Sequence, residues 1–483
     1  MWMGRRKDEE AQMKDKEEKT YPDAVPYDVQ AFLDFVSAAT SPYHAVMAAG
    51  AELSAAGFVE LDLGAPWELA TDGKYFVKVY DSTLLAFTVG AKGPLRMAAA
   101  HTDFPCFRLK PQAMEAEGAS CGLVNVEPYG GMIYRTWLDR PLSLAGKVVA
   151  RGSDPFHPVV HLVDAHLPLM TIPSLAIHRD RDVNKKGEIE AQRDLQPLFA
   201  LQPLEPGGTK DWISETFGMP DAPDDLLSYD LMTYPFEQGC TFGAANIFGE
   251  DGPAPEAGGL LSSPRLDNMT SVWACVQGLV AAAEAGVPDG VRLVALFDNE
   301  EVGSRTKQGA GSAVLMETLR RIYASALVAG WNSADDAGGA NAADGSRAAG
   351  ERLAAALADG FLLSCDVAHG DHPAYPSKSD PYISTQLGAG VVIKQAASQK
   401  YAGDAEAVAI VRSLCEAQDI PYQMFVNRSG APGGSTLGSI ASALVPVRTM
   451  DVGVPVLAMH SARETMGTTD EGALVALVRA VLE

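Results

Sequence analysis

The chain of 483 residues carries 38 lysines and arginines against 62 aspartates and glutamates, which gives a formal net charge of −24 at pH 7. That much negative charge argues against nucleic acid or an anionic membrane as a partner. A hydrophobic fraction of 47% and a charged fraction of 21% are typical of a soluble globular protein, and the length predicts two or three domains.

The sequence also predicts a cellular compartment. Because it has no apolar run of about 18 residues, we expect no membrane span. The first twenty residues lack the apolar stretch of a signal peptide. The six cysteines are scattered without a Cys-x-x-Cys pair, which favours reduced thiols over disulfides or a structural zinc site. We therefore expect a cytoplasmic protein.

The first part of the chain predicts the start of an α/β domain. Residues 1–27 form a charged tail without an assigned role, and residues 28–108 begin with a helical region over Val29–Ala56. The strands expected after it lie near Lys74–Tyr80, Thr83–Val89 and Arg96–Ala100.

The middle of the chain has a different composition. Residues 109–254 carry short β-type runs, such as Val148–Ala150 and Val159–Val163, among many glycines and prolines. Long helical periods are missing there. We interpret this stretch as a β-rich domain inserted into the α/β domain.

From residue 255 to residue 483, helices and apolar strands alternate again. The predicted helices are Ser271–Ala285, Ser312–Val328 and Ala405–Gln418, and the predicted strands are Val291–Phe297, Phe361–Cys365 and Val454–Ala458. This alternation predicts an α/β fold with a doubly wound, mainly parallel sheet. The Gly-, Ala- and Asp-rich stretch Asn332–Gly350 is expected to be a mobile surface loop between two helices.

Two adjacent glutamates, Glu300 and Glu301, follow the strand expected at Val291–Phe297. A solvated pair in a surface loop would explain them. In open α/β sheets, however, ligands bind beyond the carboxyl ends of the strands. One glutamate could hold a metal ion there while its neighbour moves a proton.

Four further groups stand at a strand end or a helix start, namely His101, Asp267, Asp366 and His460. Each has an ordinary alternative: a histidine after a strand is often structural, and Asp267 fits a helix N-cap. Together they predict imidazoles and carboxylates that converge at one edge of one sheet. Carboxylates gathered in this way repel one another unless cations compensate them. Histidine and carboxylate ligands without thiolate suit Zn²⁺ or a similar divalent ion.

Several motifs resemble those of the M18 metallopeptidases, the aspartyl-aminopeptidase type. They are AAAHTDFPCFRLKP, SPRLDN, LFDNEEVGS, CDVAHGDHPAYPSKSDP and MHSARETMG, and they occur in order over nearly the whole chain after Asp28. The resemblance implies a sheet of the zinc-peptidase type with an inserted β-rich dimerisation domain. It also implies peptide substrates and a homo-oligomer built from dimers, with a dodecamer among the expected assemblies.

The resemblance implies two Zn²⁺ ions in each subunit, with Mn²⁺ or Co²⁺ as substitutes. Asp267 would bridge the two ions. His101 and Asp366 would complete one position, and Glu301 and His460 would complete the other.

The remaining site residues have expected roles as well. Glu300 would be the general base that takes a proton from the attacking water and returns it to the leaving amine. Asp103, two residues after His101, would accept the second ring N–H of that imidazole and orient it. His178 would reach the active site of a neighbouring subunit to steady the oxyanion, a role that His372 could share.

The resemblance implies a preference for N-terminal Asp or Glu, with Lys394 as the acid-binding residue. A solvated lysine at a strand end is the alternative interpretation of Lys394. Other readings of the whole chain are a dizinc aminopeptidase of neutral specificity, an M42-like peptidase or deacylase, and a non-catalytic oligomeric binding protein. The last would lack a ligand or the base, and none is missing. No glycine-rich nucleotide-binding motif occurs at a strand–helix junction.

Overall fold

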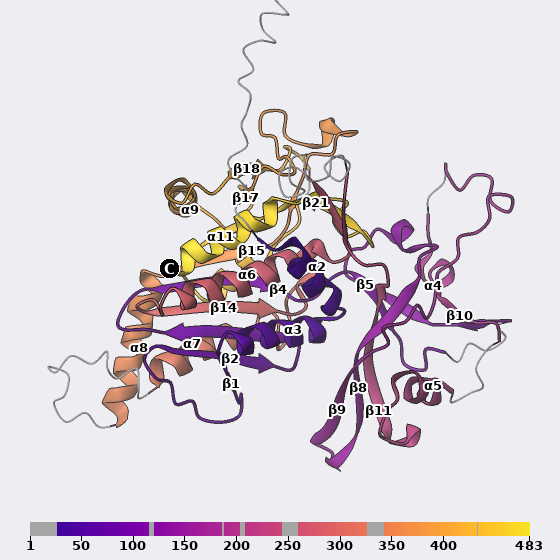
Figure 1. Cartoon of the computed structure of the whole chain (residues 1–483), viewed down its shortest axis with the longest axis horizontal. Coiled ribbons are helices and arrows are strands. Elements are labelled where there is room, and N and C mark those ends of the chain that lie inside the picture. The colour runs from indigo at the N-terminus through magenta and orange to yellow at the C-terminus, as the bar shows by residue number, and fades with distance from the viewer. Residues whose placement is uncertain are drawn as a thin grey trace, which may run out of the picture.

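The computed structural model describes residues 27–114, 120–185, 188–202, 208–243, 259–325, 342–431 and 433–483. Over these residues the chain forms one body around a nine-stranded sheet and a second, β-rich body that projects from it (Figure 1). The predicted α/β fold with a mainly parallel sheet is confirmed. Residues 1–26 of the predicted tail lie outside the described residues.

The central sheet places the carboxyl ends of its middle strands at one edge. Its strands follow the order β1 (Val59–Leu61), β2 (Gly73–Val79), β3 (Thr83–Val89), β14 (Val291–Phe297), β4 (Leu95–His101), β15 (Phe361–Cys365), β19 (Arg448–Gly453), β17 (Val391–Gln395) and β18 (Tyr422–Val426). β14, β4, β15 and β19 run parallel to one another. Every residue of β14 is buried, as expected for a strand covered on both faces.

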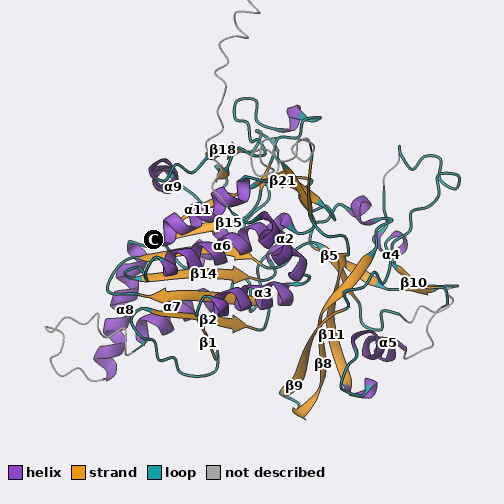
Figure 2. Cartoon of the chain, viewed as in Figure 1, coloured by secondary structure: helices purple, strands orange, loops and turns teal. Residues whose placement is uncertain are grey.

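Helices cover both faces of this sheet (Figure 2). One face packs against α2 (Val29–Ala38), α3 (Pro42–Ala55), α6 (Leu266–Glu284), α9 (Ala405–Ala417) and α11 (Asp470–Leu482). The other face packs against α7 (Val314–Ala324), α8 (Ala342–Ala358) and α10 (Leu437–Leu444). The side chains of β4 contribute to both faces: Ala98 and Ala100 pack in the core on the first face, and Met97 and Ala99 pack in the core on the other. Side chains of a strand alternate between the two faces.

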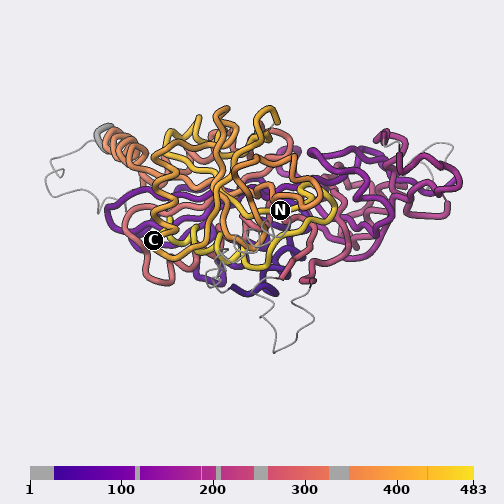
Figure 3. The backbone as a smooth tube through the Cα atoms, turned by 90° about the horizontal axis from the view of Figure 1, so that it is seen from above, coloured from indigo at the N-terminus to yellow at the C-terminus, as the bar shows by residue number. Residues whose placement is uncertain are grey.

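The β-rich body is built on an antiparallel sheet. Its strands follow the order β7 (Val126–Tyr129), β5 (Cys106–Leu109), β11 (Leu226–Pro235), β8 (Leu142–Asp154) and β9 (His157–Asp164). A strand pair of β6 (Gly122–Leu123) and β10 (Leu198–Ala200) and the helices α4 (Ala191–Asp194) and α5 (Gly208–Phe217) accompany it. Seen from above, this body forms one end of an elongated molecule (Figure 3).

A third sheet follows the order β12 (Cys240–Phe242), β13 (Leu260–Ser263), β21 (Glu464–Gly467), β20 (Pro455–Leu457) and β16 (Ala368–His369). The strand predicted at Val454–Ala458 is therefore β20 of this sheet. The C-terminal strand of the central sheet is β19, which the prediction missed. Among the described residues, no helix is long and apolar enough to cross a membrane.

The predicted helical region over Val29–Ala56 is confirmed and consists of two helices, because the Ser41 hydroxyl caps α3 and Pro42 opens it. The loop predicted at Asn332–Gly350 is wrong for residues 342–350, which belong to α8, while residues 332–341 lie outside the described residues. The glycines there suggested a loop, but alanine is the strongest helix former, and α8 is rich in it.

Candidate metal centre

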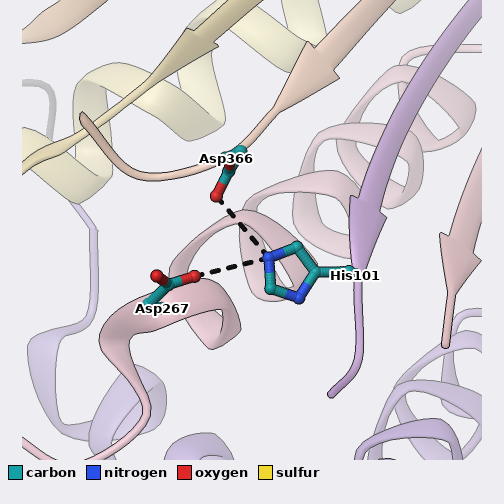
Figure 4. A group of neighbouring side chains, drawn as sticks. All are labelled: His101, Asp267 and Asp366. Atoms are coloured by element: carbon teal, nitrogen blue, oxygen red, sulfur yellow. Dashed lines mark ion pairs between the residues drawn. The ribbon is translucent and has the colours of Figure 1, made fainter. Parts of the chain in front are cut away.

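Three candidate ligands meet at the carboxyl edge of the central sheet. His101 ends β4, Asp366 follows β15, and Asp267 lies in the first turn of α6 (Figure 4). The Nε2 atom of His101 lies 3.3 Å from Oδ1 of Asp267 and 3.6 Å from Oδ1 of Asp366. The three side chains thus point their ligand atoms at one small volume.

A second group shares Asp267 with the first. The Nε2 atom of His460 lies 3.3 Å from Oδ2 of Asp267 and 3.6 Å from Oε2 of Glu301. His460 follows β20 of the third sheet, so the prediction that all these groups come from one sheet edge is wrong for it. The two carboxylate oxygens of Asp267 therefore face two different histidines. This is the geometry of a bridging ligand.

Hydrogen bonds fix the orientation of both imidazoles. Nδ1 of His101 lies 3.0 Å from the main-chain carbonyl oxygen of Asp103, and Nδ1 of His460 lies 2.7 Å from that of Gly131. A carbonyl can only accept, so each Nδ1 donates, and each Nε2 is directed at the carboxylates. The carboxylate predicted to orient His101 lies farther from Nδ1, at 3.4 Å, so the carbonyl of Asp103 is its hydrogen-bond partner.

The Asp103 carboxylate instead organises the Glu300–Glu301 turn. Its oxygens accept the main-chain N–H groups of Glu300 at 3.0 Å and Glu301 at 3.1 Å. They also accept the hydroxyl of Tyr129 at 2.8 Å, and this hydroxyl accepts the side-chain amide of Asn299 at 2.8 Å. A buried carboxylate with three donors is well satisfied without a cation of its own.

Glu300 is a further carboxylate beside the candidate ligands. It is half-buried and lines the same pocket as the candidate ligands. Burial, together with Asp366, Asp103 and Asp267, outweighs the effect of His101 and raises the pKa of Glu300 to about 8 in the metal-free chain. A carboxylate whose pKa is raised toward neutrality is suited to accept and return a proton.

The residues present fit divalent metal ions. Three groups have ligand atoms within 4.8 Å of one another: His101, Asp267 and Asp366; His101, Glu300 and Glu301; Asp267, Glu301 and His460. Oδ1 of Asp267 and Oε1 of Glu301 are buried without a hydrogen-bond partner. Buried carboxylate oxygens without partners are costly, and a cation relieves that cost. A ligand set of nitrogen and oxygen atoms suits zinc.

Lys394 lies beside this cluster and is buried, with 1% of its surface exposed. Its Nζ donates to the carbonyl oxygens of Asp366 at 3.1 Å and Val367 at 3.2 Å, and it lies 3.5 Å from Oδ2 of Asp366. The alternative of a solvated lysine is therefore wrong. Burial acts to lower the pKa of Lys394, but Asp366 and Asp451 outweigh it and raise that pKa.

A pocket of about 320 Å³ opens onto the cluster. The candidate ligands, Glu300 and Lys394 line it together with His369, Tyr401, Phe425 and Met459. His372 is not among its lining residues: it is exposed, and its ring lies 4.9 Å from that of Tyr375. His178 is exposed in the β-rich body. Within one chain the structure does not bring these two histidines to the cluster, and their roles stay predictions.

Sequence reasoning missed Glu464, Tyr129 and His369. Glu464 is buried in β21, where its carboxylate accepts the main-chain N–H groups of Asp267 at 2.9 Å and His460 at 2.8 Å. In the sequence, the available signal for Glu464 was that a glutamate stands in the run of strand-forming residues after His460. Tyr129 has no local signal, because its contacts are made across the fold. His369 lies three residues after Asp366, in the same motif as His372.

A buried set of histidine and carboxylate ligands beyond the carboxyl ends of a mainly parallel sheet defines a metal-dependent hydrolase of the zinc-peptidase type. The sequence matches the family described as aminopeptidase I zinc metalloprotease (M18) over residues 35–481. The chain therefore belongs to the M18 family and is a zinc-dependent aminopeptidase, a metalloexopeptidase. The family predicted from the motifs is confirmed.

Individual relatives agree with this assignment. The chain is 38% identical to a probable M18 family aminopeptidase 2 of Clostridium acetobutylicum, over 91% of this chain and 94% of the relative. It is 34% identical to aspartyl aminopeptidase 4 of Saccharomyces cerevisiae, over 91% of each chain. Its structure is similar to a chain in a cryo-EM structure of the Ape4 and Nbr1 complex, with a TM-score of 0.81 and 30% identity over 94% of this chain and 84% of that one.

Proposed function

We propose that this aminopeptidase works with two zinc ions, and that the position of Asp267 between His101 and His460 is the observation that carries the proposal. Each oxygen of Asp267 lies 3.3 Å from the Nε2 atom of a different histidine. Asp366 would complete the position beside His101, and Glu301 the position beside His460. Mn²⁺ and Co²⁺ accept the same ligand types and would substitute for zinc.

The bound ions would supply Lewis acidity, which polarises a peptide carbonyl and makes water acidic enough to ionise near neutral pH. Glu300 would take the proton from the attacking water and return it to the leaving amine. Its raised pKa supports this role, because the group must hold a proton between the two steps. The oxyanion would be steadied by the metal positions and, through an associated subunit, by His178. Sharing of this role by His372 remains a prediction.

We infer a preference for an acidic N-terminal residue from Lys394. It is the one lysine or arginine among the described residues that line the pocket. The Lys394 ammonium donates to two main-chain carbonyls and lies 3.5 Å from Oδ2 of Asp366, and its positive charge would also attract a substrate carboxylate. A relative is named aspartyl aminopeptidase 4, which supports the same preference. Against it, Tyr401, Phe425 and Met459 offer apolar lining, which favours a neutral residue.

Hydrolysis of a substrate panel by the zinc-loaded enzyme tests the specificity. The panel holds Asp, Glu, Leu and Ala anilides with an N-acetylated control. The proposal predicts preference for Asp or Glu, no cleavage of the acetylated compound, and loss of that preference in Lys394→Met. Because Lys394 contacts Asp366, zinc content is measured for both proteins. Preference for Leu or Ala would retain the metal chemistry and discard the acid-binding role.

We also propose a homo-oligomer built from dimers, with the β-rich body as the dimer surface. Strand β9 lies at the edge of its sheet and exposes Val159, Val160 and Leu162, and Phe156 before it is 90% exposed. Apolar side chains gathered on an edge strand favour association. Light scattering of the wild type and of Val160→Glu tests this. The variant should release smaller species, and an unchanged mass would refute the surface.

A further inference from the structure

We infer that the β-rich body orients Glu301 and His460, the ligands of one metal position, through the segment Tyr129–Ile133. Asp366, a ligand of the other position, is held by contacts within the central sheet. This inference rests on the proposed two-ion centre. It assigns Tyr129 as a positioning residue for Glu301, and Gly131 and Ile133 as positioning residues for His460.

The segment forms hydrogen bonds with both the ring and the main chain of His460. The carbonyl oxygen of Gly131 accepts the Nδ1–H of His460 at 2.7 Å. The N–H of Ile133 donates to the carbonyl oxygen of His460 at 2.9 Å. Just beyond the segment, the Thr136 hydroxyl oxygen accepts the N–H of Ala462 at 2.8 Å. The direction of the His460 ring and the path of its loop thus both depend on the β-rich body.

The same segment holds Glu301 through Asp103. The Tyr129 hydroxyl donates to Oδ2 of Asp103 at 2.8 Å, and this oxygen also accepts the N–H of Glu301 at 3.1 Å. Gly130 packs directly on the glutamate: a Cβ atom on it would lie 3.1 Å from Cβ and 3.3 Å from Oε2 of Glu301. Its φ of +74° is also one that favours glycine.

The other position has different supports. His101 donates to the main-chain carbonyl of Asp103, whereas the Tyr129 hydroxyl donates to the side chain of that residue. The N–H of Asp366 donates to the carbonyl of Val452 in β19 at 2.9 Å, and Lys394 of β17 holds its carbonyl. β17 and β19 are strands of the central sheet. The contacts of the segment therefore fall on Glu301 and His460, and loss of one should affect one ion selectively.

The test uses the full-length, zinc-loaded enzyme and the variant Tyr129→Phe, which deletes one hydroxyl and keeps the ring. Each protein is equilibrated with graded zinc-buffering chelator, and bound zinc per chain is measured by atomic emission. Loss of an outer-shell partner typically lowers metal affinity about 10–100-fold. We expect Tyr129→Phe to lose one ion at a free zinc concentration about 10–100-fold higher than the wild type does. The second ion should be retained as in the wild type.

A matched control and two combined variants identify the position. Tyr229→Phe removes a partly buried hydroxyl in the same β-rich body that donates to the Lys110 carbonyl at 2.6 Å, and it should leave both ions unchanged. Combined with His460→Ala, Tyr129→Phe should add no further loss, because that position is already disabled. Combined with Asp366→Ala, it should weaken the ion that remains.

Three outcomes would overturn the inference. If Tyr129→Phe retains both ions as the wild type does, the segment has no positioning role. If it weakens both ions equally, the supports are not divided between the two positions. If the wild type itself holds fewer than two ions, the proposed two-ion centre fails first, which distinguishes the two failures. Gly130→Ala is a second variant that should reproduce the selective loss, because its added Cβ atom would crowd Glu301.

Discussion

The carboxylate of Asp103 accepts the main-chain N–H of Glu300 at 3.0 Å, so the residue two positions after the candidate ligand His101 fixes the turn that carries the proposed base. Asp103→Ala removes this acceptor and leaves the N–H groups of Glu300 and Glu301 without it. Because outer-shell changes typically cost about 10–100-fold in metal affinity or activity, we expect kcat to fall by that factor. Steady-state hydrolysis measures it, and an unchanged kcat would contradict the role of Asp103.

Glu300→Gln should separate proton transfer from metal binding. The amide keeps the size of the side chain but cannot take a proton, so we expect turnover to fall by about 10²–10⁴-fold. Zinc per chain should stay at the wild-type value. Glu284→Gln, at the exposed end of α6, is the control and should leave both quantities unchanged. Retained turnover in Glu300→Gln would remove it as the base.

Asp267→Ala should empty both metal positions, because each of its oxygens faces a different histidine. Asp366→Ala is the matched comparison, since its carboxylate approaches only His101 of the two histidines. We expect metal analysis after dialysis to find almost no zinc in the first variant and one weakened position in the second. Two ions retained by Asp267→Ala would refute the bridge.

Zinc binding should release protons and should strengthen as the pH rises. In the metal-free chain, burial acts to lower the pKa of His460, but Asp267 and Glu301 raise it to about 10. The pKa of His101 is raised in the same way: burial opposes the rise, and Asp103, Asp267 and Asp366 outweigh it. Both shifts favour the protonated imidazole, which must lose a proton before it binds a metal.

Calorimetric zinc titrations in buffers of different ionisation enthalpy count these protons. We expect zinc binding to release protons at pH 7, because His101, His460 and Glu301 all have raised pKa values without metal and must be deprotonated to bind it. Zinc affinity should therefore rise between about pH 6 and pH 8. An affinity that stays constant over this range would contradict a protonated metal-free site.

The sequence was sufficient to predict five neighbouring strands of the central sheet (β2, β3, β14, β4 and β15) and the candidate ligands. Val291–Phe297 and Phe361–Cys365 are apolar runs of strand length, and both match observed strands. Their polar ends, with His101 and Asp267, then marked the site. β19 was missed because Arg448–Gly453 holds Thr449 and Asp451 at buried positions, which gives no continuous apolar run.

The contacts that orient the ligands could not be predicted from local sequence. Tyr129 and Asp103 lie 26 residues apart, and Gly131 and His460 lie 329 residues apart. Such pairs are set by how the β-rich body packs on the central sheet, and neither residue type nor spacing encodes that. The burial of Lys394 could not be predicted for a similar reason: its partners are main-chain carbonyls, which carry no sequence signal.

The most direct test of the two-ion centre is anomalous X-ray diffraction at the zinc edge from crystals of the zinc-loaded enzyme. A two-ion centre predicts two peaks in each subunit, one among His101, Asp267 and Asp366 and one among Asp267, Glu301 and His460. A single peak, or two peaks of which only one contacts Asp267, would contradict it.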